Sequence, residues 1–195
     1  MFHAAAHEFA HAGYDAARVD RISAKARVNK AMLYYHYGSK PDLYVEVLRD
    51  MFRAVGLRAR TIADGPGAAD TKLEGWILTI VEEAAARPWF PPIMLGELAS
   101  GAQHIDAATF EMMNAVFVSF RAICVQGQQE GQFRDADPLL TYLTILPPIL
   151  IFFARQRVLS QRKNVQRLAA GAPRSVDDFI RHMQSTTRAM LRRET

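Results

Sequence analysis

Apolar residues recur along the whole chain at intervals of three and four, and no long stretch alternates between apolar and polar positions. This spacing places apolar side chains on one face of an α-helix, whereas a half-buried strand would need a period of two. Gly, Pro, Asp and Ser cluster where the pattern breaks, as is typical of helix ends and turns. The sequence therefore predicts an all-α protein of about nine helices, over residues 2–12, 18–25, 29–37, 41–62, 70–87, 91–101, 106–130, 138–158 and 175–192.

Many of the predicted helix ends carry residues that are favoured there. Gly13 suits the end of the first helix, because glycine readily adopts the left-handed conformation that ends many helices. Polar side chains that accept a hydrogen bond from the first turn precede several later helices. The predicted N-caps are Asn29, Ser39 before Pro41, Asp70, Asp137 before Pro138, and Ser175, which forms a capping box with Asp178.

The composition is that of a globular protein that stays inside the cell. Half of the residues are hydrophobic and 23% are charged. Cys124 is the single cysteine, so no internal disulfide can form, and no basic and apolar leader opens the chain. The longest apolar run, residues 139–154, is short of the roughly 20 residues that span a bilayer and is interrupted by Pro147-Pro148. We therefore expect a cytoplasmic protein without a membrane partner, in which this run forms a buried, kinked helix.

The net charge of +4 lies entirely in the first part of the chain. Residues 1–60 hold ten Lys and Arg against six Asp and Glu, whereas residues 61–195 hold fourteen of each. Residues 18–40 contain six basic residues and a single acidic residue, Asp20. A local excess of this kind indicates a polyanion as partner, although a solvated basic face would have the same composition.

Residues 7–11 read His-Glu-Phe-Ala-His, which matches the H-E-x-x-H pattern of zinc metalloproteases. Such an enzyme needs a third protein ligand, and the residues that follow the motif at the required spacing cannot bind a metal. Helical angles place Phe9 on an apolar face and both His7 and His11 on another. We therefore expect solvated histidines and no metal site or cofactor, and a zinc metalloprotease is retained as a remote alternative.

The predicted helix over residues 29–37 carries large apolar and aromatic side chains on more than one face. If Leu33 faces inward, then Ala31 and Tyr35 point outward, flanked by Met32 and Tyr34. Outward residues of these types suit the major groove of DNA, where they can contact thymine methyl groups and phosphates. The alternative is that Met32, Tyr34 and Tyr35 form core for a neighbouring helix.

Residues 9–48 closely resemble the DNA-binding region of the TetR family of bacterial transcription repressors. The resemblance rests on Phe9-Ala10, Gly13-Tyr14, Val19, Ile22, Ala26, Val28-Asn29-Lys30, Leu33-Tyr34-Tyr35-His36, Ser39-Lys40 and Leu43. Tyr37 replaces the usual core Phe and Ser23 replaces the usual Ala. The chain also begins within the first helix of the family pattern, so either a phosphate contact from a basic arm is missing or the true start lies earlier. The expected DNA-binding residues are Arg18, Asn29, Lys30, Ala31, Met32, Tyr34, Tyr35, His36 and Lys40.

The resemblance implies a helix-turn-helix domain of three helices followed by a helical domain that binds a small molecule and forms a dimer. The glycine-rich segment "DGPGAAD", residues 64–70, indicates the boundary. We expect a DNA-binding domain over 1–48, a connecting helix and linker over 49–69, and a ligand-binding and dimerisation domain over 70–195. Candidate pocket residues, which could equally be plain core, are Trp76, Met94, Glu97, His104, Phe110, Met113, Asn114, Phe117, Arg121 and Tyr142.

The expected function is that of a ligand-responsive regulator rather than an enzyme. A homodimer, joined through the helix over 138–158 and the last helix, would bind a palindromic operator and be released by a small molecule. A helical dimer that binds small molecules without a DNA function remains the alternative. A second basic run, made of Arg155, Arg157, Arg162, Lys163 and Arg167, is interpreted as solvated rather than as a second DNA contact.

Overall fold

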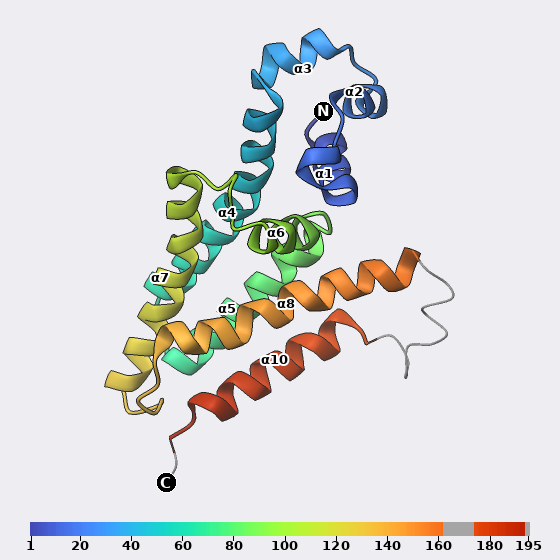
Figure 1. Cartoon of the computed structure of the whole chain (residues 1–195). Coiled ribbons are helices and arrows are strands. Elements are labelled where there is room, and N and C mark those ends of the chain that lie inside the picture. Colours follow the sequence, from blue (N-terminus) through green and yellow to red (C-terminus); the bar gives the residue numbers. More distant parts are fainter. Residues whose placement is uncertain (162–173, 194–195) are drawn as a thin grey trace.

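The computed structural model describes residues 1–161 and 174–193, and these residues form nine helices (Figure 1). Arg162, Lys163 and Arg167 of the second basic run lie outside the described residues. The predicted all-α fold is confirmed, and most predicted helices lie within a few residues of the observed ones. The helices are α1 (Phe2–Ala16), α2 (Val19–Ala26), α3 (Lys30–Tyr37), α4 (Lys40–Asp64), α5 (Ala69–Ala86), α6 (Phe90–Ala99), α7 (Ala107–Gln129), α8 (Pro138–Gln161) and α10 (Val176–Leu191).

Helices α1, α2 and α3 and the first turns of α4 form one end of the molecule, which we call the head (Figure 1). Its core is made of Phe9 from α1, Ile22 from α2, Leu33 from α3, and Leu43 and Val47 from α4, all of which are buried. Each of these residues lies on the apolar face of its own helix, which points inward. One apolar residue from each short helix thus holds the three helices against α4.

The turn between α2 and α3 uses two local devices. Arg27 ends α2 in the left-handed conformation (φ 57°), which redirects the chain within three residues. Asn29 then caps α3, because its side-chain oxygen accepts a hydrogen bond from the Met32 N–H at 2.8 Å. Gly38, with φ 78°, ends α3 at a backbone conformation that other residues rarely adopt. The predicted caps at Asn29 and Ser39 are confirmed.

Helices α5 to α8 and α10 form the remainder, which we call the body, and α4 extends into it from the head (Figure 1). Within the body α4 packs against α7 and α5, and α5 packs against α7, α8 and α10. Ion pairs join α4 to its neighbours at the surface: Arg58 to Glu82 (2.6 Å), Arg87 to Asp50 (2.8 Å) and Arg49 to Asp106 (2.6 Å). The body therefore holds α4 along most of its length.

Two predicted helix ends are wrong. Helix α1 does not stop at Gly13 but resumes after a non-helical break there (φ 75°, ψ 172°) and ends at Ala16. Asp70 does not cap α5, which begins one residue earlier, at Ala69. The first N–H groups of α5 instead donate to side chains beyond the end of α7, from Ala69 to Glu130 (3.3 Å) and from Asp70 to Gln132 (3.1 Å). This cap depends on the tertiary structure, so no pattern of neighbouring residues could have predicted it.

Helix α8 differs from its sequence interpretation in length and exposure. It runs for 24 residues and continues through Pro147 and Pro148. Both α8 and α7 are long and apolar enough to cross a membrane. Core helices of globular proteins meet the same criterion, and both helices pack against other helices of the body. Only one side of α8 is buried, however, because Leu140, Leu143 and Ile151 are all exposed.

A test of packing is available near the end of α7, where the Phe133 ring lies against Gly127. A methyl group at Gly127 would come within 2.1 Å of the Phe133 ring, and Phe133 is buried. Alanine normally stabilises a helix relative to glycine by about 1 kcal/mol. We expect Gly127→Ala to lower the free energy of unfolding instead, by about 1–3 kcal/mol, because overpacking outweighs helix propensity.

Chemical denaturation of both variants measures this difference. The matched control is Gly56→Ala in α4, where a methyl group meets nothing within 4 Å and stability should rise by about 0.5–1 kcal/mol. Equal stabilisation by the two substitutions would show that Phe133 does not pack on Gly127.

Candidate nucleic-acid interface and internal cavity

Helix α3 exposes its aromatic side chains and buries only Leu33. Leu33 is fully buried, whereas the exposed fraction of Tyr35 is 84% and that of Tyr34 and Met32 is 45%. Ala31 is exposed as well. Within the described chain these residues are therefore not core for a neighbouring helix. Their exposure on a short helix at the tip of the head leaves a surface of small, apolar and phenolic groups.

Lys30 and Lys40, the two lysines near α3, both interact with other residues of the head. Lys30 forms an ion pair with Asp20 of α2, and both side chains are largely exposed. Such exposed pairs are weak and exchange readily for another anion. Lys40 Nζ lies 4.6 Å from the centre of the Tyr14 ring and donates to the Asp15 carbonyl oxygen at 3.3 Å. The cationic end of Lys40 thus joins the start of α4 to the end of α1.

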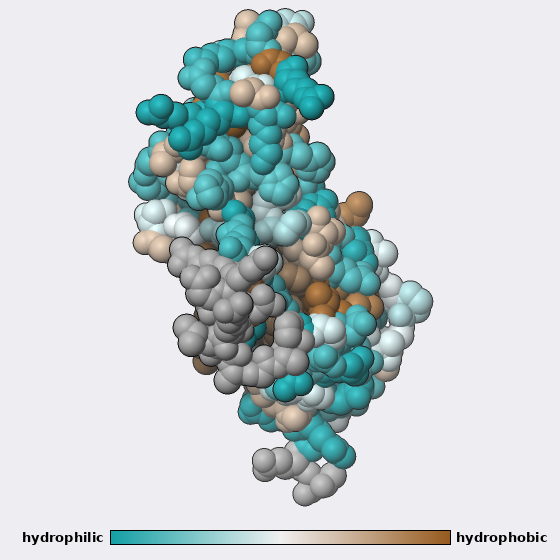
Figure 2. All heavy atoms as spheres, turned by 90° about the vertical axis from the view of Figure 1, so that its right-hand side faces the viewer, coloured by the Kyte–Doolittle hydropathy of each residue, from teal (hydrophilic) through white to brown (hydrophobic). Residues whose placement is uncertain are grey.

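Two further predicted residues lie at this end of the molecule. Arg18 precedes α2, is exposed, and donates its backbone N–H to Glu8 at 3.4 Å. His36 is exposed and its ring contacts that of Tyr35 edge-on. All nine predicted DNA-binding residues therefore lie in the head. Figure 2 shows one side of this head as a largely hydrophilic surface, with brown, apolar atoms gathered in the body.

The two positions where the head departs from the family pattern differ in their surroundings. Ser23 is buried in α2, and its hydroxyl has no hydrogen-bond partner in the described part of the chain. Tyr37 is half-buried at the end of α3.

The H-E-x-x-H motif lies on α1 without the surroundings of a metal site. His7 and His11 are exposed while Phe9 is buried, as the helical angles predict. Partial desolvation of its ring, together with the positive charge of Lys25, lowers the pKa of His7. Glu8 is the partner of Arg21 (3.6 Å) and of the Arg18 backbone. No group of three or more His, Cys, Asp and Glu within residues 1–161 and 174–193 could hold a metal ion.

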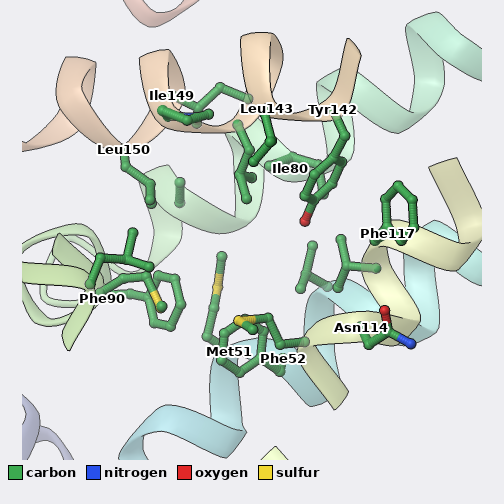
Figure 3. A pocket seen from close by; sticks show the side chains of 18 of the residues that line it. Met51, Phe52, Ile80, Phe90, Asn114, Phe117, Tyr142, Leu143, Ile149 and Leu150 are labelled. Atoms are coloured by element: carbon green, nitrogen blue, oxygen red, sulfur yellow. The ribbon is translucent and has the colours of Figure 1, made fainter. Parts of the chain in front are cut away.

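The body contains an apolar cavity of about 270 Å³ between α4, α5, α6, α7 and α8 (Figure 3). Its walls carry the side chains of Met51, Phe52, Val55, Ile80, Ala84, Phe90, Met94, Leu98, Phe110, Met113, Asn114, Val116, Phe117, Leu139, Tyr142, Leu143, Leu146, Pro147, Ile149 and Leu150. Asn114 and Tyr142 are the polar residues of this set. A concave, mostly apolar site with a few polar groups is typical of small-molecule binding.

Six predicted pocket residues line this cavity, and four lie elsewhere. The six are Met94, Phe110, Met113, Asn114, Phe117 and Tyr142. Trp76 is buried in the core of the body, where its indole N–H donates to Ser119 at 3.0 Å. Arg121 is exposed on the outer side of α7. Glu97 and His104 point towards the head instead of the cavity, as described below.

Sequence reasoning missed the contribution of α4 to the cavity. Met51, Phe52 and Val55 line it, although α4 begins in the head. Their spacing of one, three and four residues marks the buried face of α4, but the same pattern is expected wherever a helix faces a solid core. The choice between core and cavity depends on the other helices, so no local signal could have made it.

A buried carboxylate joins the head to the body. Glu97 of α6 is 2% exposed, and its Oε1 accepts a hydrogen bond from the Tyr44 hydroxyl of α4 at 2.6 Å. His104 Nδ1 lies 2.9 Å from the same oxygen, and the His104 backbone N–H donates to Oε2 at 3.3 Å. The His104 ring also lies on Tyr14 of α1, with 3.9 Å between ring centres. We call Tyr14, Tyr44, Glu97 and His104 the junction cluster.

The electrostatics of the junction cluster keep the Tyr44 hydroxyl protonated. Burial, followed by the hydrogen bond to Glu97, raises the pKa of Tyr44 far above its ordinary value. Tyr44 therefore acts as a permanent donor to the buried carboxylate. Such a charge-assisted hydrogen bond is stronger than a neutral one, and its loss would leave a buried charge with fewer partners.

The single thiol of the chain does not belong to any of these sites. Cys124 is buried on α7, and burial raises its pKa to about 12. A thiol of this kind is a core residue and not a nucleophile, because the thiolate is the reactive species.

Comparison with known proteins identifies relatives of both halves. The family model described as "Bacterial regulatory proteins, tetR family" matches residues 2–47, which include α1 to α3 and the first turns of α4. The HTH-type transcriptional repressor SCO4008 of Streptomyces coelicolor is 36% identical over 151 residues, which cover 75% of this chain and 72% of the relative. The HTH-type transcriptional repressor NicS of Pseudomonas putida is 26% identical over 156 residues, 77% of this chain and 71% of the relative.

Solved structures share the fold over nearly the whole chain. The ketosteroid transcriptional regulator KstR2 of Mycobacterium tuberculosis superimposes with a TM-score of 0.78 at 21% identity, covering 99% of this chain and 93% of that one. PfmR from Thermus thermophilus, a TetR family transcriptional regulator, gives a TM-score of 0.76 at 18% identity over 98% of both chains. At these identities the likeness concerns the fold.

The junction cluster generates a stability prediction. Tyr44→Phe removes the hydroxyl that donates to Glu97, and we expect the free energy of unfolding to fall by about 1–3 kcal/mol because the carboxylate stays buried. For a chain of this size the melting temperature should fall by roughly 2–10 °C. Amide hydrogen exchange of α1 and of residues 100–105 should accelerate, while exchange in α5 and α7 should not change.

The matched control is Tyr37→Phe, which removes a half-buried hydroxyl from the end of α3 without touching Glu97. Similar exchange profiles for both variants would mean that the Tyr44–Glu97 hydrogen bond does not hold the head to the body.

Proposed function

Because the chain belongs to the TetR family of bacterial transcriptional regulators, we propose that it is a ligand-responsive repressor that binds a palindromic operator as a dimer. As its relatives are, it is a DNA-binding regulator and not an enzyme. We propose the palindromic operator, the dimer and the response to a ligand as further properties of this chain. The observation that carries the proposal is the exposure of Tyr34 and Tyr35 on α3 over a buried Leu33.

The surface of α3 supports a role in reading DNA. In a helix-turn-helix the second helix lies in the major groove, and its N-terminal residues contact base edges. Ala31 allows close approach, Met32 offers an apolar contact, and the hydroxyls of Tyr34 and Tyr35 can donate to phosphates. Arg18, Lys30 and Lys40 supply positive charge at the edges of the same surface. Since Lys30 is paired only with an exposed Asp20, a phosphate can replace that partner.

The exposed side of α8 supports a dimer. Leu140, Ile151 and Val158 are all exposed and follow one side of the helix. A row of this length on a monomer would leave a large apolar patch in water, which soluble proteins avoid. Beside it, Phe179 of α10 stacks on Phe152 of α8 with 4.0 Å between ring centres. We propose that α8 and α10 of two copies pack together and set the two heads for half-sites about 34–36 Å apart or near multiples of that spacing.

Helices α4 and α6 support a link between the cavity and the head. Both line the cavity, α4 through Met51 and Phe52 and α6 through Met94 and Leu98. Both also meet in the junction cluster, where Tyr44 bonds to Glu97. A molecule that fills the cavity and shifts α6 relative to α4 would therefore change how the head is held. Its effect on DNA affinity is limited to its preference for one arrangement over the other.

The alternative functions have less support. A helical dimer without DNA function would have no use for three exposed apolar and aromatic residues on α3 above a basic surface. A zinc metalloprotease lacks a third ligand beside His7 and His11 in the described chain.

DNA binding by the full chain tests the proposal directly. We expect fluorescence polarisation to show tighter binding to a duplex spanning the intergenic region upstream of its gene than to a shuffled duplex of equal composition. Tyr35→Ala should weaken specific binding by about fivefold or more, the equivalent of one lost hydrogen bond. Lys30→Ala should weaken binding to both duplexes and reduce the slope of log affinity against log salt by about 1.

Two substitutions outside the head serve as controls. Leu57→Ala removes an exposed apolar side chain from α4, and Arg60→Ala removes an exposed cation from the same helix. Neither should change DNA binding. If all four variants bind like the unaltered protein, α3 is not the recognition helix.

A further inference from the structure

We propose, on the premise that the cavity is the effector site of the regulator described above, that the effector is an uncharged, largely apolar molecule. It has about ten non-hydrogen atoms and carries one hydrogen-bond acceptor, which binds to the hydroxyl of Tyr142.

The absence of charge follows from the cavity wall. None of the side chains that line the cavity in the described part of the chain is charged. Glu97 is the buried carboxylate of α6, but its oxygens are taken up by Tyr44 and His104 on the side of the helix that faces the head. An ion in the cavity would lose its hydration without gaining an opposite charge, which is strongly unfavourable. The wall therefore selects against carboxylates and ammonium groups.

The hydrogen-bond acceptor follows from the position of Tyr142. This residue is 8% exposed, and its ring packs against Trp76, Phe117 and Phe120. Its hydroxyl points into the cavity (Figure 3) and has no hydrogen-bond partner among the residues that the structure describes. Burial raises the pKa of Tyr142, so the group remains a neutral donor. A carbonyl or ether oxygen of a bound molecule would satisfy this donor.

Asn114 supplies the second polar group and marks the entrance. It lines the cavity from α7 and is itself exposed, as are Phe110 on the same helix and Leu139 and Leu143 at the start of α8. Access from solvent therefore lies between the N-terminal half of α7 and the start of α8. The rim therefore carries a polar side chain, whereas the apolar part of a bound molecule lies deeper.

The size follows from the volume. A cavity of 150 Å³ accommodates benzene, so about 270 Å³ corresponds to roughly ten non-hydrogen atoms. Phenylalanine rings from three helices, Phe52, Phe90 and Phe117, line this space together with the thioethers of Met51 and Met94. Rings and thioethers pack well on a flat apolar group.

Isothermal titration calorimetry with four probes of similar size tests the proposal on the full chain. The probes are 4-phenyl-2-butanone, butylbenzene, 3-phenylpropanoate and 4-phenylbutylammonium. We expect the ketone to bind about tenfold or more tightly than either charged probe, because neither charge finds a partner. Tyr142→Phe should weaken binding of the ketone by roughly two- to tenfold and leave butylbenzene unchanged, since only the ketone accepts a hydrogen bond.

Tyr37→Phe is the matched control, because it removes a tyrosine hydroxyl from the head and should alter neither affinity. The proposal is overturned if a charged probe binds as tightly as the ketone, if none of the probes binds, or if Tyr142→Phe does not change the preference for the ketone over butylbenzene.

DNA binding measured with the same probes separates this inference from the proposed function. Release of DNA by a charged probe and not by the ketone would overturn the effector class while the ligand-responsive function stands. Binding of the ketone with the predicted selectivity but no change in DNA affinity would support the cavity chemistry and contradict ligand-controlled release.

Discussion

The continuity of helix α4 constrains every other part of this molecule. Its 25 residues form one helix of about 37 Å, held by backbone hydrogen bonds along its whole length. Leu43 belongs to the core of the head, Tyr44 to the junction cluster, and Met51 and Phe52 to the cavity wall. A continuous helix without an internal proline does not kink cheaply. A displacement of α4 at the cavity would therefore move the part of the helix that belongs to the head.

The junction cluster determines how tightly that movement is coupled. Contacts between α1 and α6 also connect head and body, and they include apolar contacts such as Phe2 against Trp89. Apolar contacts can slide, whereas the hydrogen bonds from Tyr44 and His104 to Glu97 require particular positions. Because Glu97 is buried, breaking those bonds leaves a charge without partners, and so the arrangement favours discrete positions over gradual sliding.

The two halves of the chain use aromatic residues in opposite ways. In the head, Tyr34 and Tyr35 are exposed on a helix too short to bury more than Leu33, and they are available to an external partner. In the body, Phe52, Phe90 and Tyr142 face an internal space that their own packing leaves unfilled. The first arrangement suits a large, charged partner that surrounds the helix, and the second suits a small, uncharged one that the helices surround.

The sequence by itself determined the features that depend on a few neighbouring residues. With Leu33 taken as inward, the helix period placed Tyr35 outward, and it separated Phe9 from His7 and His11 despite the metalloprotease motif. Asn29 and Ser39 were identified as caps because a cap is a bond between residues two or three apart. The family resemblance of residues 9–48 added the helix-turn-helix, which is again a local unit.

Only the tertiary structure decided which distant residues meet. Glu97 and His104 lie on the same segment as the cavity residue Met94, yet they face α1 and α4, and a sequence pattern cannot distinguish the two sides of α6 when both are buried. The cap of α5 comes from Glu130 and Gln132, some sixty residues away. The cavity needs five helices at fixed separations. Helical periodicity specifies which face of a helix is buried, but only the packing of all the helices specifies against which neighbour, and whether any space is left between them.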